Sequence, residues 1–211
     1  MTPPKPSRRS RPAVTIAIEN WRGRSAEGRV LALRPFINVR MTKNLGVYLA
    51  GPGVFRPDAQ TFGEAMKELA RDYGLTGLWP LDNAVSDDDP AALARKIFEA
   101  NVAMIDAAVA IVADISPFRG PYMDPGTAFE IGYAHACGKP IFAWTSDPRT
   151  LHARTEAQMQ GSMHSLHGTD AQGWTIENFG LIENLMIAVP ARGVYDTAEL
   201  AIEAAARYLM E

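Results

Sequence analysis

Val109-Ala-Ile-Val-Ala-Asp-Ile115 runs directly into Ser116-Pro-Phe-Arg-Gly-Pro-Tyr-Met-Asp-Pro-Gly126, and these two stretches decide the fold class. The first is a short, continuous apolar run, typical of a strand buried on both faces of a parallel sheet. The second is a Gly/Pro-rich loop, after which residues 127–136 predict a helix. A loop that leaves the carboxyl end of such a strand lies where open α/β sheets bind ligands. Asp124 and Glu130, at the junction of loop and helix, are therefore the first candidates for chemistry.

Short apolar runs alternate with helical patterns along the rest of the chain. Strands are predicted at 44–50, 75–79, 109–115 and 141–144, with helices between them at 58–74, 89–108 and 127–136. This β-α-β-α-β-α-β order is typical of a doubly wound parallel sheet. The polar residues 146–173 indicate a long loop, and helices are predicted at 178–189 and 196–210, the last opened by the capping-box pattern Asp196-x-x-Glu199. Because 211 residues with 47% hydrophobic content suffice for one core, we expect a single α/β domain.

The charge of the chain is divided unevenly. Residues 1–40 hold nine Lys and Arg against two acidic side chains, about +7, which leaves about −10 for residues 41–211. We expect residues 1–40 to be a basic, disordered and dispensable N-terminal extension, and residues 41–211 to form the folded domain. The acidic domain is a poor surface for nucleic acid polymers and anionic membranes, so neither is expected as a partner.

Cysteine and histidine usage limits the chemistry further. The single cysteine, Cys137, falls inside a predicted helix, where we expect a small core residue, and it cannot form an internal disulfide. No apolar run reaches the roughly 18 to 20 residues that span a bilayer, so we expect a cytoplasmic protein. His152, His164 and His167 match no zinc-binding spacing, and we expect neither a metal nor another cofactor.

Asp124 and Glu130 each have a structural and a chemical interpretation. Thr127-x-x-Glu130 is also a capping-box pattern, in which the carboxylate bonds to its own helix, and Asp124 could simply be a turn residue before Pro125. On the chemical interpretation, the positive end of the helix dipole favours an ionised Glu130. Two carboxylates around an anomeric carbon are the usual equipment for cleaving a glycosidic bond.

The first strand and the loop after it supply three more candidates. Tyr48, near the end of that strand, could direct its hydroxyl toward Glu130 if the first and third strands are neighbours; otherwise it is an amphipathic tyrosine at the sheet edge. Gly51 opens a tight Gly-Pro-Gly loop that could cradle a ligand. Phe55 could stack on a base or belong to the core.

Asn101 is a polar residue on an apolar helix face. The predicted stripe consists of Leu93, Ile97, Met104, Ile105 and Ala108, and Asn101 lies four residues beyond Ile97. It could contact a substrate in the site, or it could hydrogen-bond a strand-end backbone group, since buried polar groups are normally satisfied.

Five segments, in order and spacing, resemble the nucleoside 2-deoxyribosyltransferase family: Tyr48-Leu-Ala-Gly-Pro-Gly-Val-Phe55, Pro80-Leu-Asp-Asn83, Ile97-Phe-Glu-Ala-Asn101, Ser116-Pro-Phe-Arg-Gly-Pro121 and Asp124-Pro-Gly-Thr-Ala-Phe-Glu-Ile-Gly-Tyr-Ala134. The resemblance covers about residues 44–145 and, more weakly, 178–186. It implies a flavodoxin-like fold and exchange of a 2-deoxyribosyl group between nucleobases, so that deoxynucleosides and free nucleobases would be the partners.

The resemblance also implies roles for individual residues. The glutamate that matches Glu130 attacks the anomeric carbon, the aspartate that matches Asp124 handles the proton of the base, and the tyrosine that matches Tyr48 orients the nucleophile. Subunits of the family complete one another's sites near the sugar 5′ end. In a homo-oligomer with shared active sites, Glu183 or Asn184 would then reach a partner's pocket.

Two departures from the family pattern leave alternatives open. Asn101 stands where many members carry an aspartate, and Ala84 where some place a base-reading glutamine, so the base preference is undecided. A hydrolase of nucleosides or nucleoside 5′-phosphates is one alternative, with Arg119 or Ser116 contacting a phosphate. A non-catalytic nucleotide-binding module, which needs only the cradle at Gly51, is the other.

Overall fold

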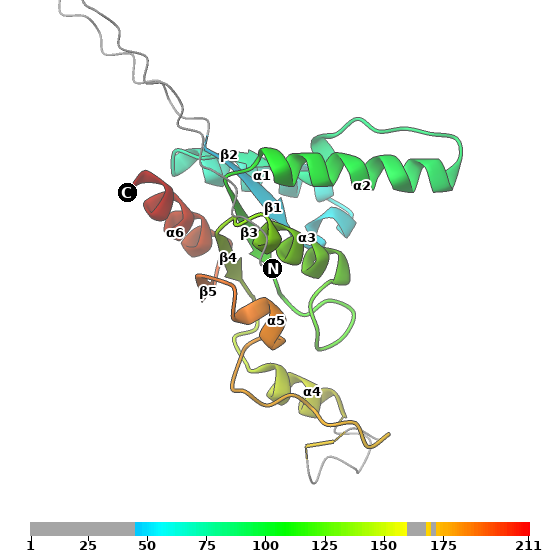
Figure 1. The fold of residues 1–211 in the computed structure, drawn as a ribbon, viewed down its shortest axis with the longest axis vertical. Coiled ribbons are helices and arrows are strands. Elements are labelled where there is room, and N and C mark those ends of the chain that lie inside the picture. Colours follow the sequence, from blue (N-terminus) through cyan, green and yellow to red (C-terminus); the bar gives the residue numbers. More distant parts are fainter. Residues whose placement is uncertain (1–44, 160–167, 170–171) are drawn as a thin grey trace, which may run out of the picture. The chain divides into compact units, whose positions relative to one another are not determined.

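A parallel five-stranded sheet forms the centre of the protein (Figure 1). The computed structural model describes residues 45–159, 168–169 and 172–211, so the predicted extension 1–40 lies outside the described residues. The order β2-β1-β3-β4-β5 confirms the doubly wound, flavodoxin-like prediction, and its reversal between β1 and β3 marks the edge where such sheets bind ligands. The strands are β1 (Gly46–Ala50), β2 (Thr76–Leu78), β3 (Ala110–Asp114), β4 (Ile141–Trp144) and β5 (Gly193–Tyr195).

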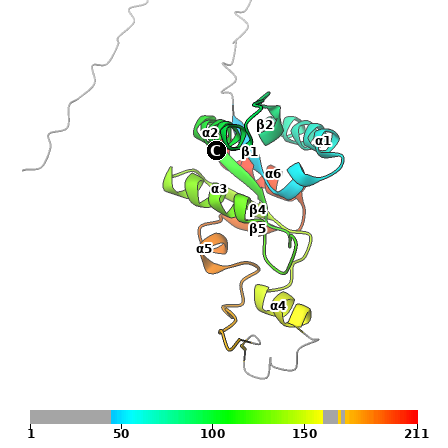
Figure 2. The ribbon, with the colours of Figure 1, turned by 90° about the vertical axis from the view of Figure 1, so that its right-hand side faces the viewer.

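Helices cover both faces of the sheet, as Figure 2 shows. Alternate residues of β1 serve the two faces: Val47 and Leu49 belong to the core beneath α1 and α6, whereas Tyr48 and Ala50 belong to the core beneath α2 and α3. Within the described part of the chain, no helix combines the length and apolarity needed to cross a membrane. The helices are α1 (Ala59–Asp72), α2 (Pro90–Ala107), α3 (Pro125–Ala136), α4 (Leu151–Met159), α5 (Leu185–Ala188) and α6 (Ala198–Met210), with 3-10 turns η1 (Pro52–Phe55) and η2 (Pro80–Asp82).

Two helices begin at residues other than those predicted. Helix α3 starts at Pro125, two residues before the predicted position, because a proline suits the first helical turn and the Asp124 side chain accepts the backbone N–H of Thr127 at 2.8 Å. Helix α6 is capped by Thr197, whose hydroxyl accepts the N–H of Leu200, and not by Asp196. For α6, the prediction of a polar N-cap residue was correct, but the position of that residue was wrong.

Three predictions for the second half of the chain are wrong. The expected loop 146–173 contains α4, whose buried side includes the polar Arg154 and Thr155, so no apolar periodicity revealed it. The expected helix 178–189 is reduced to the four residues of α5, and β5 after it is only three residues long. Cys137 is exposed at the end of α3 and not in the core.

Candidate active site

A cavity of about 310 Å³ lies on the α2–α3 side of the sheet, beyond the carboxyl ends of β1 and β2. It brings together five residues that the sequence singled out: Gly51, Phe55, Asn101, Asp124 and Glu130. The β1 loop, the η2 turn, helix α2 and the start of α3 each supply part of its lining. Residues from four separate segments of the chain therefore meet at the ligand-binding edge of the fold, as the topology requires.

Tyr48 and Glu130 form the central contact of this site. The pleat of β1 directs Tyr48, which is fully buried, toward α3, and its O–H donates to Oε1 of Glu130 at 2.6 Å. Glu130 lies on the second turn of α3, beyond the cap. The capping-box interpretation is wrong, because Asp124 caps the helix and the carboxylate of Glu130 turns to the tyrosine.

The surroundings of Glu130 favour its protonated form. The pKa of Glu130 is raised to about 7, because burial and, to a smaller extent, the nearby charge of Asp124 outweigh the hydrogen bond from Tyr48, which lowers it. Burial also raises the pKa of Tyr48 far above its ordinary value, so the phenol remains a hydrogen-bond donor. Near neutral pH, a substantial fraction of Glu130 is ionised, and its carboxylate forms no salt bridge with any residue that the structure describes.

Asp124 combines a structural role with a place in the cavity. Its Oδ2 accepts both the backbone N–H of Thr127 at 2.8 Å and the Thr127 hydroxyl at 3.0 Å, and the residue is only 7% exposed. Asp124 is therefore the N-cap of helix α3 and not a simple turn residue. These two bonds fix the carboxyl group beside Glu130.

Helix α2 contributes an apolar and a polar group to the cavity. Ile97, predicted to lie in the core, is 44% exposed and lines the cavity. Oδ1 of Asn101 is buried, and no described residue hydrogen-bonds to it, so the predicted backbone bond is wrong for this atom. An unpaired buried acceptor in a cavity is a candidate for contact with a bound ligand.

Comparison with known proteins identifies the family. The profile described as "Nucleoside 2-deoxyribosyltransferase" matches residues 47–186. The chain belongs to the nucleoside 2-deoxyribosyltransferase family. A solved 2-deoxyribosyltransferase from Leishmania mexicana is 34% identical, with a TM-score of 0.61, over 77% of this chain and 97% of that one. An uncharacterized protein of Schizosaccharomyces pombe, C191.05c, is 34% identical over 160 residues, 66% of this chain and 74% of that protein.

This nucleoside 2-deoxyribosyltransferase family member is thus an enzyme of the pentosyltransferase type. The sequence did not identify every lining residue of its cavity. Val54, Pro80, Leu81 and Thr127 also line it, beside Ile97. Because Ile97 follows the apolar pattern of α2, the sequence predicts that it is buried in the core. Only the path of α2 past the edge of the sheet shows that this side chain faces a cavity instead.

Phe55 and Arg119 belong to a cluster of aromatic and cationic side chains in this family member. Phe55 is 56% exposed, so the core interpretation is wrong, and its ring stacks on Phe118 with centroids 5.5 Å apart. The Arg119 guanidinium lies 4.6 Å from the Phe118 centroid and 5.4 Å from that of Phe55. Arg119, with a φ of 56°, is exposed on the loop and does not line the 310 Å³ cavity.

Glu183 and Asn184 lie away from the cavity of their own chain. Glu183 is 1% exposed and pairs with Arg154 at 2.7 Å, so the idea that it reaches a partner's pocket is wrong. Asn184 caps α5 by accepting the N–H of Met186 at 3.0 Å, and its amide donates to Glu177 at 2.7 Å. It lines a separate pocket with Trp174 and other residues. Among the histidines, His152 pairs with Glu156 in α4, while His164 and His167 lie outside the described residues.

Proposed function

We propose that the enzyme transfers a 2-deoxyribosyl group from one nucleobase to another through a covalent bond between Glu130 and the anomeric carbon. The observation that carries this proposal is the 2.6 Å hydrogen bond from Tyr48 to a largely buried Glu130, in a cavity that also holds Asp124. A carboxylate that is held by a neutral donor keeps its charge available for an electrophilic carbon.

In the first step, an oxygen of ionised Glu130 attacks C1′ of the deoxynucleoside. The C1′–N bond breaks, its electron pair passes to the departing base, and Asp124, which is protonated in the reactive form of the site, transfers that proton to the base nitrogen and becomes a carboxylate. Tyr48 fixes the direction of attack through its bond to Oε1. The products are a glutamyl ester of the sugar and a free base.

In the second step, an incoming base attacks C1′ through a ring nitrogen. The bond from C1′ to Glu130 breaks, the carboxylate is regenerated, and Asp124 takes the proton that the incoming base loses. The two steps are therefore the same reaction in opposite directions, and one acid–base group serves both.

The remaining predicted residues hold the substrate. The unpaired Oδ1 of Asn101 is placed to accept a hydrogen bond from a sugar hydroxyl. Phe55 offers a ring face to the base, and Gly51 keeps the loop free of a side chain. In an oligomer, Asn184 of a second subunit would contact the 5′ end of the sugar.

An exchange assay tests the reaction. With deoxyinosine and free adenine, we expect deoxyadenosine and hypoxanthine in equal amounts, whereas a hydrolase yields free deoxyribose with no new nucleoside. Glu130→Gln should abolish the exchange, and Glu68→Gln, on the exposed side of α1, serves as the matched control. Exchange at the wild-type rate by the Glu130→Gln protein would exclude Glu130 as the nucleophile.

Mass spectrometry tests the covalent step. A slow, fluorinated deoxyribosyl donor should leave an adduct on the peptide that contains Phe129 and Ile131, and free adenine should then remove it. Turnover of this donor without any trapped adduct would argue for direct displacement.

A further inference from the structure

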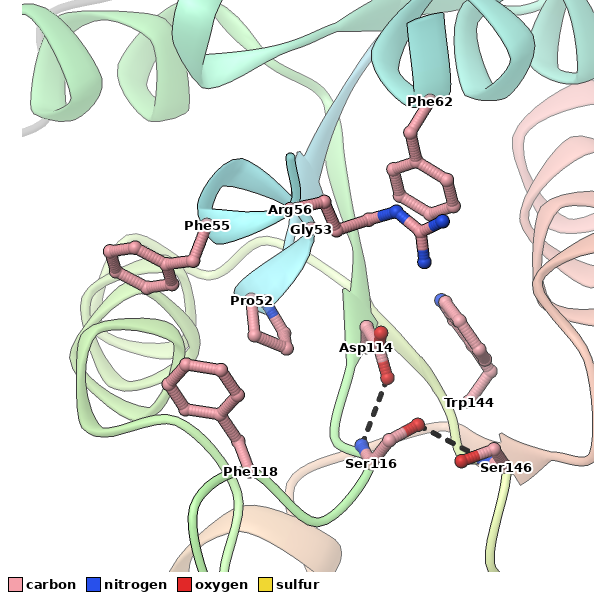
Figure 3. A pocket seen from close by; sticks show the side chains of 10 residues that line it. All are labelled: Pro52, Gly53, Phe55, Arg56, Phe62, Asp114, Ser116, Phe118, Trp144 and Ser146. Atoms are coloured by element: carbon pink, nitrogen blue, oxygen red, sulfur yellow. Dashed lines mark hydrogen bonds between the residues drawn. The ribbon is translucent and has the colours of Figure 1, made fainter. Parts of the chain in front are cut away.

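A second cavity, of about 330 Å³, lies on the other side of the β1 loop (Figure 3). Its walls come from the α1 side of the sheet and from the ends of β3 and β4, whereas the catalytic cavity faces α2 and α3. Phe55 lines both cavities. The volume falls within the range of small-molecule sites, and the proposed transfer reaction uses none of the other lining residues.

The polar group of this cavity is the carboxyl of Asp114. The residue ends β3, and its Oδ1 accepts the backbone N–H of Ser116 at 2.9 Å (Figure 3). Burial raises the pKa of Asp114, while the hydroxyl and the backbone N–H of Ser116 lower it. A Cβ on Gly51 would come within 2.7 Å of the Asp114 Cβ, so the glycine is what permits the loop to pass this close.

Aromatic groups form the walls. Phe62 and Trp144 stand on one side with the Arg56 guanidinium, and Phe118 stands across the cavity from them (Figure 3). Arg56 is already paired with Asp58 at 2.8 Å and lies 4.7 Å from the Phe62 centroid. Its charge is therefore largely engaged, and the cavity favours a flat, neutral ring over a phosphate.

Two serines complete the polar side. The backbone N–H of Ser146 donates to the Ser116 hydroxyl oxygen at 3.0 Å, and the Ser116 hydroxyl in turn donates to the carboxyl of Asp114. The Ser146 hydroxyl lies at the exposed rim. Together with Asp114, these groups offer both acceptors and donors along one edge of a planar ligand.

We propose that this second cavity binds a free nucleobase, with its ring between the aromatic walls and its N–H groups directed to Asp114. The inference rests on the proposed function, because a free base is what that reaction releases and consumes. A carboxyl group that accepts N–H donors from a heterocycle, with aromatic faces on either side, is the ordinary chemistry of base recognition in proteins.

Equilibrium dialysis with radiolabelled adenine tests the site on the full chain, without a sugar donor. Ser146→Trp fills the second cavity from its exposed rim, and Ile97→Trp fills the catalytic cavity. We expect adenine binding to persist in Ile97→Trp and to be lost in the double variant Ile97→Trp/Ser146→Trp, while Ile97→Trp/Ser146→Ala binds like Ile97→Trp. Loss of adenine binding in Ile97→Trp overturns the proposal, as does its persistence in the double variant or its absence in the wild type.

A second variant covers the case in which Ser146→Trp misfolds. Asp114→Asn should weaken adenine binding in the Ile97→Trp background by about tenfold, the loss expected for one hydrogen bond to a charged group. Displacement of adenine by phenylalanine but not by guanine would assign the cavity to amino acids and overturn the nucleobase class. The exchange assay is read separately: wild-type protein that binds adenine in the second cavity but exchanges no base would refute the proposed function alone.

Discussion

Glu130 and Glu183 are two glutamates that are shielded from water, and their carboxylates have different partners. Burial raises the pKa of both. Glu183 is compensated by Arg154 at 2.7 Å and by the backbone N–H of Asn184 at 3.1 Å. Among the described residues, Glu130 has only the Tyr48 hydroxyl as hydrogen-bond donor, and the like charge of Asp124 is its neighbour.

The difference separates structural from reactive burial. A charge that is paired and fully hydrogen-bonded is held in place, and losing its partner is costly. A carboxylate next to a neutral donor and a second acid is poised between protonation states, which is common at catalytic sites. The partner of a buried carboxylate, more than its burial, indicates what it does.

The largest expected effect comes from the same substitution at both positions. Glu130→Gln should lower the exchange rate on the order of 10⁴-fold or more, because the amide cannot form the ester, and should leave the protein folded. Glu183→Gln should leave kcat within about tenfold and destabilise the protein instead. Steady-state kinetics and urea unfolding of both variants check this, and comparable loss of kcat in the two would remove the distinction.

The Arg154–Glu183 pair should show strong coupling in stability. Arg154→Met leaves a buried, uncompensated carboxylate and should cost about 3 to 5 kcal/mol in the free energy of unfolding, more than the double variant Arg154→Met/Glu183→Leu. Urea titration of the two single variants and the double variant measures the coupling. Strict additivity of the single effects would show that the two charges do not depend on each other.

Glu130 should make the stability depend on pH. Its pKa in the folded protein, about 7, exceeds its ordinary value of 4.5, so the folded state holds a proton that the unfolded chain has released. Stability contributed by this group is present below pH 4.5 and is lost as the pH rises to 7, by up to about 3 kcal/mol. The difference in the free energy of unfolding between the wild type and Glu130→Gln, measured by urea unfolding at pH 5 and at pH 8, isolates this loss. The same difference at both pH values would contradict the assigned pKa.

The smallest effect expected is that of Tyr48→Phe. The hydroxyl lowers the pKa of Glu130, so its removal should shift the acid limb of kcat/KM to higher pH and reduce the rate near neutral pH by about tenfold. Tyr133→Phe is the matched control, since this tyrosine of α3 bonds Asp106 on the surface. An unshifted acid limb in Tyr48→Phe would mean that the tyrosine positions the substrate and not the nucleophile.

The first half of the fold was predictable because its elements carry local signals. Continuous apolar strands, and Asp89 with Pro90 at the start of α2, need no tertiary context. Even the contact between Tyr48 and Glu130 followed from the expected adjacency of β1 and β3, which the strand pairing confirms.

What the sequence could not supply depends on long-range partners. Arg154 can be buried in α4 because Glu183, far along the chain, compensates its charge and backbone carbonyls accept its other N–H groups, so the helix lacks an apolar stripe. Ile97 follows the core pattern of α2 but lines the cavity, and only the assembled sheet edge reveals this. The second cavity likewise appears only when residues of α1, β3 and β4 meet.

Asp124 has a consequence for the evolution of the enzyme. Because the carboxyl that faces the cavity also closes the first turn of α3, most exchanges at this position would loosen the helix before any new chemistry could be selected. Asparagine is the main exception, since it caps nearly as well but could not carry out the proton transfer that we propose for Asp124. A single exchange of Asp124 for asparagine could therefore lead to a descendant that binds without catalysis, and a single exchange in the other direction could reverse this.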